Sequence, residues 1–87
     1  LTSLERQLGE MGITARTEAE FNRRLGARVR ALRTGAGRKL NEVAAAADIT
    51  SAQLSQIELG KTATTTWTLA RICSALQTPP TSVFSEL

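Results

Sequence analysis

Residues 51–59 place small polar and amide side chains on one face of an expected helix. At about 100° per residue, Leu54 and Ile57 turn to the opposite face, toward a protein interior. No charge lies on the polar face, although solvent-facing helix surfaces usually carry Glu and Lys. Gln can bond adenine at two points, Ser can donate or accept, and Ala can touch the methyl group of thymine. We therefore expect base contacts from Ser51, Ala52, Gln53, Ser55 and Gln56.

Two short helices joined by a tight turn, over residues 40–59, must position this face. Apolar residues at i, i+3, i+4 and i+7 predict the first helix: Leu40, Val43, Ala44 and Ala47. Asp48 tolerates turn backbone, and the Thr50 hydroxyl can cap a second helix that starts at Ser51. Gly60 supplies the left-handed residue that ends this helix. The spacing fits both a helix-turn-helix motif and a plain helical hairpin, and the uncharged face favours the motif over a merely polar surface.

Positive charge is concentrated around these helices. The net charge is +3, but residues 21–87 carry nine cations and four anions, and no acid lies between Glu20 and Glu42. Such a stretch attracts phosphates, although it can also be a solvated helix face. A basic surface beside an uncharged helix face predicts double-stranded DNA as the partner. We expect phosphate contacts from Arg38, Lys39, Thr50 and Lys61.

Composition argues against catalysis. The chain has no His, no glycine-rich phosphate loop and no Cys-x-x-Cys pair, so its Ser and Thr residues lack a base. The chain has a single cysteine, which excludes a disulfide framework. This Cys73 lies in an apolar stripe, so we expect a buried thiol in a reducing compartment. No apolar run approaches the length of about 18 residues that a membrane span needs. We expect a cytoplasmic protein that is no enzyme and needs no cofactor or metal.

The remaining apolar spacing predicts an all-α domain. Thr17 and Glu20 form a capping box before a helix that residues 35–37 end, with Gly26 unfavourable inside it. A fourth helix stops before the prolines at 79 and 80, and a fifth covers Thr81–Leu87. Trp67 is expected to be a core lid or a dimer contact. The apolar residues expected to face the core of the first and fourth helices are Phe21, Leu25, Val29, Leu32, Leu69, Ile72, Cys73 and Leu76.

The string LSQIELGK at residues 54–61 resembles the Cro and phage-repressor class of helix-turn-helix proteins, the xenobiotic-response-element family. Ala44, Ile49 and the upstream residues 29–33 agree with it in register, and the resemblance covers Leu25 to about Phe84. It implies a five-helix, phage-repressor-like DNA-binding domain with a structural ion pair between Arg33 and Glu58. It also implies a homodimer on pseudo-palindromic DNA, with half-sites about 34 Å apart.

The first residues predict a short extra helix. Thr2 and Glu5 form a capping box, and an apolar stripe of Leu4, Leu8 and Met11 follows. The domain boundaries are then 1–19 for this extension and 20–87 for the helix-turn-helix domain. The stripe must pack either on its own domain or on a second subunit.

The sequence thus predicts a sequence-specific DNA-binding transcriptional regulator. We expect a repressor that binds its pseudo-palindromic operator as a homodimer. The alternative is an antitoxin-type protein-interaction module of the same fold, which would bind a toxin partner and repress its own operon.

Overall fold

The computed structural model describes residues 3, 6, 13–84 and 87. This part of the chain has no strand and forms the five helices α2 (Glu18–Gly35), α3 (Leu40–Ala46), α4 (Ser51–Glu58), α5 (Thr66–Leu76) and α6 (Pro80–Phe84). The prediction of an all-α, five-helix domain is confirmed. The extra helix predicted from Thr2 to Met11 falls in a segment of which only residues 3 and 6 are described.

The long helix α2 begins and ends where flanking residues satisfy free backbone groups. At its start, the Thr17 hydroxyl accepts a hydrogen bond from the Glu20 N–H at 3.1 Å, as the capping pattern predicts. At its end, the Ala36 N–H donates to the Leu32 carbonyl at 3.1 Å. Gly37 then takes a φ of 69°, where only glycine escapes a steric penalty. The chain turns here and enters α3.

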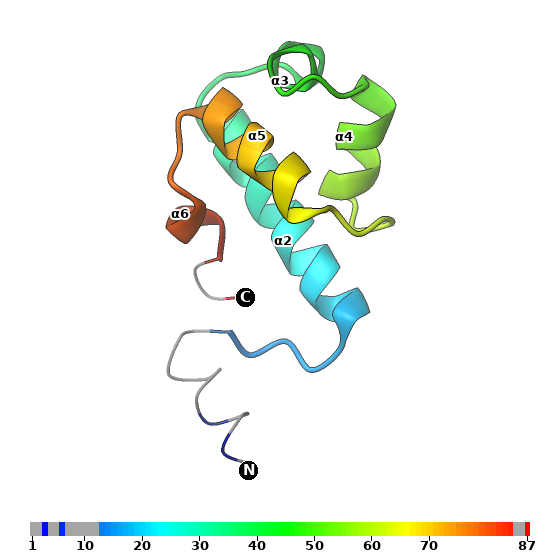
Figure 1. Ribbon diagram of the computed structural model, residues 1–87, viewed down its shortest axis with the longest axis vertical. Helices are drawn as coiled ribbons and strands as arrows, with labels where there is room; N and C mark the ends of the chain where they lie inside the picture. The colour runs from blue at the N-terminus through cyan, green and yellow to red at the C-terminus, as the bar shows by residue number, and fades with distance from the viewer. Residues whose placement is uncertain (1–2, 4–5, 7–12, 85–86) are drawn as a thin grey trace.

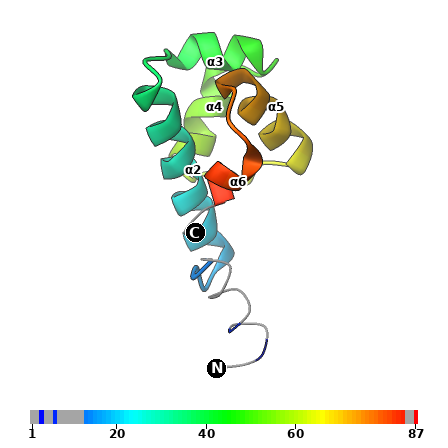
Figure 2. The same ribbon diagram turned by 90° about the vertical axis from the view of Figure 1, so that its left-hand side faces the viewer.

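The hydrophobic core lies between α2 and the shorter helices. α2 packs against α4 and α6, and α3 packs against α4 and α5. Figures 1 and 2 both show α3 across the C-terminal end of α2. The apolar stripes predicted from spacing supply this core, and its largest fully buried side chains are Val29, Val43, Leu54, Ile72 and Val83.

Two glycines allow the backbones of α2 and of the end of α4 to touch. A Cβ on Gly26, inside α2, would lie 2.1 Å from the carbonyl oxygen of Ile57. A Cβ on Gly60, just after α4, would lie 2.6 Å from the Cα of Arg23, and the φ of Gly60 is 71°. Gly26 lowers the helix propensity of α2, but it permits this close crossing. Helix periodicity alone does not reveal the contact.

The structure corrects two local predictions. The last helix, Pro80–Phe84 as described, begins one residue before the predicted Thr81, and Leu87 is not helical, while residues 85 and 86 lie outside the described part of the chain. Leu87 is 2% exposed, so it packs in the core without belonging to the helix as described. Trp67 is 70% exposed, so the prediction of a core lid is wrong. Its ring lies on the outer side of α5, one turn before Arg71, whose guanidinium carbon is 5.6 Å from the ring centroid.

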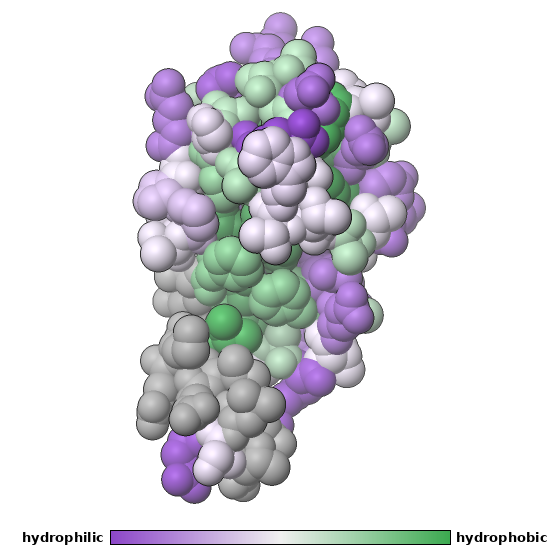
Figure 3. Space-filling model, viewed as in Figure 1, coloured by the Kyte–Doolittle hydropathy of each residue, from purple (hydrophilic) through white to green (hydrophobic). Residues whose placement is uncertain are grey.

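The surface is mostly polar on the face seen in Figure 1. Figure 3 shows hydrophilic residues around a hydrophobic patch near the middle of that face. Phe84 is among the exposed large apolar side chains of the described residues, and its ring stacks on Phe21 with centroids 6.3 Å apart. This contact holds α6 against α2. None of the described helices has both the length and the apolar character to cross a membrane.

Candidate nucleic-acid interface

The turn between α3 and α4 fixes the direction in which α4 leaves. Asp48 takes a left-handed φ of 58°, as its turn position predicts. The Gln53 N–H then donates to the Thr50 hydroxyl oxygen at 3.0 Å, while the Thr50 N–H donates to the Gln53 side-chain oxygen at 2.8 Å. This reciprocal pair is a capping box, and it satisfies two backbone donors at the start of α4.

The C-terminal end of α4 is closed as firmly as its start. The Gly60 N–H donates to the Ile57 carbonyl, and the Lys61 N–H donates to the Gln56 carbonyl, each at 3.0 Å. Together with the positive φ of Gly60, these two bonds form a Schellman motif. An eight-residue helix would not be stable alone, and here both of its ends are held by the chain.

The sequence-predicted base contacts lie together on the outside of α4. Leu54 and Ile57 are buried at 0% and 6% exposure, as predicted. We call the opposite surface the polar face. Its residues are exposed except for the partly buried Ser55, and they are Ser51, Ala52, Gln53, Ser55 and Gln56.

The two glutamines of the polar face have different hydrogen-bonding capacity left. The side-chain oxygen of Gln53 already accepts the Thr50 N–H, so its amide group retains mainly its donors. Among the described residues, the side chain of Gln56 has no hydrogen-bond partner. A bidentate contact to adenine needs a donor and an acceptor on one amide, and Gln56 is the glutamine in which both are entirely unused.

An ion pair between Arg33 and Glu58 joins α2 to the last turn of α4. The Arg33 Nε and a terminal guanidinium nitrogen donate to the two Glu58 carboxylate oxygens at 2.7 and 2.9 Å. Their side chains are only 13% and 5% exposed. The hydrogen bond to Glu58 raises the pKa of Arg33 above its usual value. The structure thus brings together the two residues that the resemblance paired.

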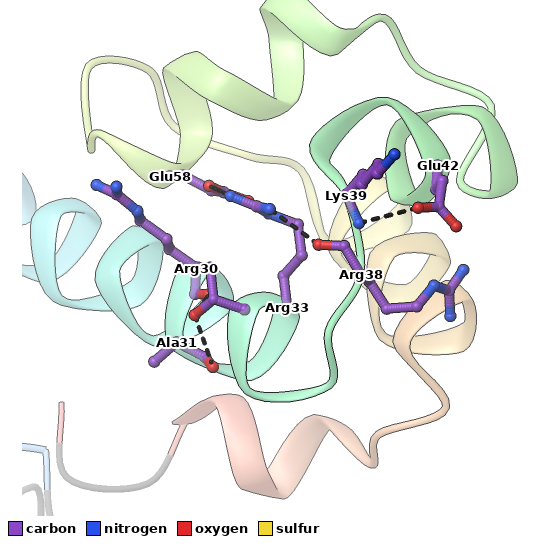
Figure 4. A network of polar contacts seen from close by, with 8 residues as sticks. Arg30, Ala31, Arg33, Arg38, Lys39, Glu42 and Glu58 are labelled. Atoms are coloured by element: carbon purple, nitrogen blue, oxygen red, sulfur yellow. Dashed lines mark hydrogen bonds and ion pairs between the residues drawn. The ribbon is translucent and has the colours of Figure 1, made fainter.

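Arg33 also fixes the connection between α2 and α3. Its other terminal nitrogen donates to the backbone carbonyl of Arg38 at 3.0 Å. In Figure 4 the Arg33 guanidinium lies between Glu58 and this carbonyl. One side chain therefore holds three segments in place: α2, the end of α4, and the residue before the cap of α3.

The four residues predicted to contact phosphates have different surroundings. Arg38 is partly buried, and a terminal nitrogen of its guanidinium donates to the Ala75 carbonyl at 3.2 Å, near the end of α5. Figure 4 shows this side chain directed away from α4. Lys39 and Lys61 are exposed, and neither ammonium group has a partner among the described residues. Thr50 caps α4 through its oxygen and keeps its hydroxyl proton to donate.

A second group of hydroxyls lies beside the polar face. A hollow of about 450 Å³ separates α4 from the loop that follows Lys61, and Ala52, Gln53 and Gln56 line its α4 side. The loop side includes the side chains of Thr62 and Thr64. The sequence analysis assigned no role to these threonines, because a run of Thr after a helix is equally typical of a plain connecting loop.

No feature of the described residues indicates metal or redox chemistry. They contain no group of three or more His, Cys, Asp or Glu side chains that could hold a metal ion. Cys73 is buried at 2% exposure, and burial raises the pKa of its thiol. The thiol therefore behaves as a small core side chain.

The helices α3 and α4, joined by a tight turn, and the exposed polar face of α4 have the arrangement of a helix-turn-helix domain. Residues 24–83 match the family described as helix-turn-helix domain, and the chain belongs to that family. The chain is also similar to the crystal structure of the clp gene regulator ClgR from C. glutamicum, with a TM-score of 0.70 and 32% sequence identity. This likeness covers 71% of the present chain and 80% of the other. The search of curated proteins found no match.

Proposed function

We propose that this protein is a sequence-specific DNA-binding regulator of transcription whose α4 enters the major groove of double-stranded DNA. The observation that carries the proposal is the polar face of α4, which is uncharged, exposed and fixed by caps at both ends. Membership of the helix-turn-helix domain family and similarity to a gene regulator support it. Ser51, Ala52, Gln53, Ser55 and Gln56 read base edges under this proposal.

The structure changes the set of phosphate contacts that we propose from the one predicted from the sequence. Lys39, Thr50 and Lys61 keep free donors and remain proposed contacts. Arg38 is a weaker candidate, because its guanidinium already bonds the end of α5. An arginine can still reach a phosphate with its remaining N–H groups, since it carries five donors.

The finer assignment follows from the motif LSQIELGK. We assign the chain to the xenobiotic-response-element, Cro and phage-repressor class, acting in the cytoplasm as a repressor. It binds as a homodimer to two half-sites about 34 Å apart, one turn of DNA. Light scattering tests the dimer, and a monomer mass both free and on DNA would refute it. The antitoxin-type alternative would be favoured by an excess of apolar surface on the predicted helix that carries Leu4, Leu8 and Met11, three residues outside the described part of the chain. Co-purification of a small protein partner would also favour it.

One experiment tests the DNA proposal directly. The purified protein selects duplexes from a random pool, and its affinity for the enriched duplex is measured from 50 to 200 mM salt. We expect a pseudo-palindromic consensus and a linear fall of log affinity with log salt concentration. A flat salt response with no enriched sequence would refute DNA binding as the function.

A further inference from the structure

The cations of the helical domain divide into two groups by their surroundings. Four of them bond to protein groups away from the polar face: Arg24, Arg28, Arg38 and Arg71. Arg33 is neutralised by Glu58. Between residues 17 and 84, the cations whose side chains have no bonded partner are Arg23, Arg30, Lys39 and Lys61. The sequence analysis assigned no contact to Arg23 or Arg30.

Arg30 lies at a hollow on the flank of α4. The hollow has a volume of about 230 Å³ between α2, α3 and α4, and it is lined by Arg30, Arg33, Leu40, Ser55, Glu58 and Leu59. We call it the Arg30 hollow. In Figure 4 the Arg30 side chain extends from α2 toward the end of α4 where Glu58 lies. Ser55 brings a residue of the polar face to the same hollow.

The charge of the Arg30 hollow favours an anion. Glu58 is the carboxylate in its wall, and both of its oxygens are already bonded to Arg33. Arg33 and Glu58 cancel in charge, so Arg30 leaves the hollow with one positive charge. The side chains of Leu40 and Leu59 carry no hydrogen-bond donor, so among the lining side chains outside the Arg33–Glu58 pair the free donors are the Arg30 guanidinium and the Ser55 hydroxyl. The apolar side chains of Leu40 and Leu59 reduce the competition of water for these donors.

If α4 lies in the major groove, the dimensions of the groove favour a DNA phosphate as this anion. The major groove is about 12 Å wide, and a helix with its side chains is about 10–12 Å across. The phosphates that border the groove must therefore come close to both flanks of a helix that lies in it. The Arg30 hollow is on one flank of α4, and the hollow beside Thr62 and Thr64 is separate from it.

We propose that Arg30 binds a phosphodiester of the DNA backbone in the Arg30 hollow, with the Ser55 hydroxyl as a second donor. In that arrangement Ser55 gives its one donor to the phosphate and keeps only its acceptor lone pairs for a base edge. This inference rests on the proposed function, because it takes α4 to lie in the major groove. Arg30 is then a positioning residue that fixes how α4 sits in the groove. A phosphate contact of this kind raises affinity for every sequence equally.

The test compares Arg30→Ala and Arg30→Gln with the control Arg28→Ala. The control removes an equal charge from the same helix, but Arg28 bonds the Ser82 carbonyl. Affinity is measured by fluorescence anisotropy for the selected duplex and an unrelated duplex, from 50 to 200 mM salt. Both Arg30 variants should weaken the two duplexes by the same factor and reduce the magnitude of the salt slope by about 0.9 per bound protomer, or about 1.8 for the proposed homodimer. Arg28→Ala should keep the wild-type slope, and Arg30→Lys should largely restore it.

The outcomes separate this inference from the proposed function. If the affinity of the wild-type protein falls steeply with salt and both Arg30 variants show the same slope, the Arg30 contact alone is refuted. A flat wild-type response would refute DNA binding and the contact with it. Melting temperatures confirm that the variants fold, which we expect because Arg30 is exposed and both replacements suit a helix.

Discussion

The guanidinium of Arg33 and the carboxylate of Glu58 meet through two hydrogen bonds, 25 residues apart in the chain. Both side chains are largely buried, so neither charge can turn to water if the other is lost. The pair fastens the last turn of α4 to α2, and the same guanidinium holds the Arg38 carbonyl. The angle at which α4 is presented therefore depends on this contact.

Arg33→Met should destabilise the fold strongly. The substitution leaves Glu58 buried without its cation, which costs about 3–5 kcal/mol. Chemical denaturation measures the change in the free energy of unfolding. Replacing both residues, as Arg33→Met with Glu58→Leu, should recover much of the loss because no buried charge remains. An unchanged melting temperature in the single variant would show that the pair has no structural role.

Gly26→Ala should destabilise the protein although alanine favours helix. The new Cβ would meet the Ile57 carbonyl at 2.1 Å, so α2 and α4 must separate. We expect a loss of at least about 1–3 kcal/mol, as for overpacked cores, and weaker binding to the selected duplex. Gly35→Ala is the matched control in the same helix, since its Cβ meets nothing within 4 Å. The control should be neutral or slightly stabilising, and equal effects at both positions would contradict the crossing.

Gln56→Ala should reduce sequence discrimination rather than general affinity. Under the proposed function, Gln56 contacts a base edge, and one such contact is worth about 1–3 kcal/mol. Affinity should fall by that amount for each half-site of the selected duplex, while affinity for unrelated DNA and the salt slope stay near wild type. Equal losses on both duplexes would instead make Gln56 a positioning residue.

Stability should decline above about pH 8.5, the ordinary pKa of a thiol. Burial raises the pKa of Cys73 in the folded protein, so in this range the unfolded chain releases a proton that the folded chain retains. The contribution of the Cys73 thiol to the free energy of unfolding is fully present below the pKa of the thiol in the unfolded chain. It is lost as the pH rises through the pKa of the thiol in the folded protein. Urea midpoints from pH 7 to 10 measure it. The decline of stability with pH should be smaller in Cys73→Ala than in the wild-type protein. Equal declines in the two proteins would show that another group causes the decline.

The helices were predictable because their signals are local. Thr17, Thr50 and Gly60 mark helix ends through bonds to residues within a few positions of themselves. The bonding of Arg38 to Ala75 was not predictable, since it joins residues 37 positions apart. The need for glycine at position 26 was not predictable either, because it arises from the close contact of α2 with the end of α4.

For the candidate site, the sequence predicted which residues of α4 are exposed, but it did not predict their hydrogen bonds. Helical projection placed Gln56 on the outer face and Gln53 on its flank, but only the capping box shows that the oxygen of Gln53 accepts the Thr50 N–H. Projection likewise gave no reason to separate Arg30 from the other arginines of α2. Trp67 misled the prediction because a large apolar residue near a helix start is usually buried, and here the core is complete without it.

The division of α4 between two sets of residues has an evolutionary consequence. Leu54, Ile57 and Glu58 hold the helix in place, whereas Ser51, Ala52 and Gln56 face outward and contribute nothing to the core. Exchange of the outward residues leaves the anchoring contacts intact. Under the proposed function, a duplicated copy of this domain can therefore diverge toward new DNA target sites through a few surface substitutions, without first having to regain a stable fold.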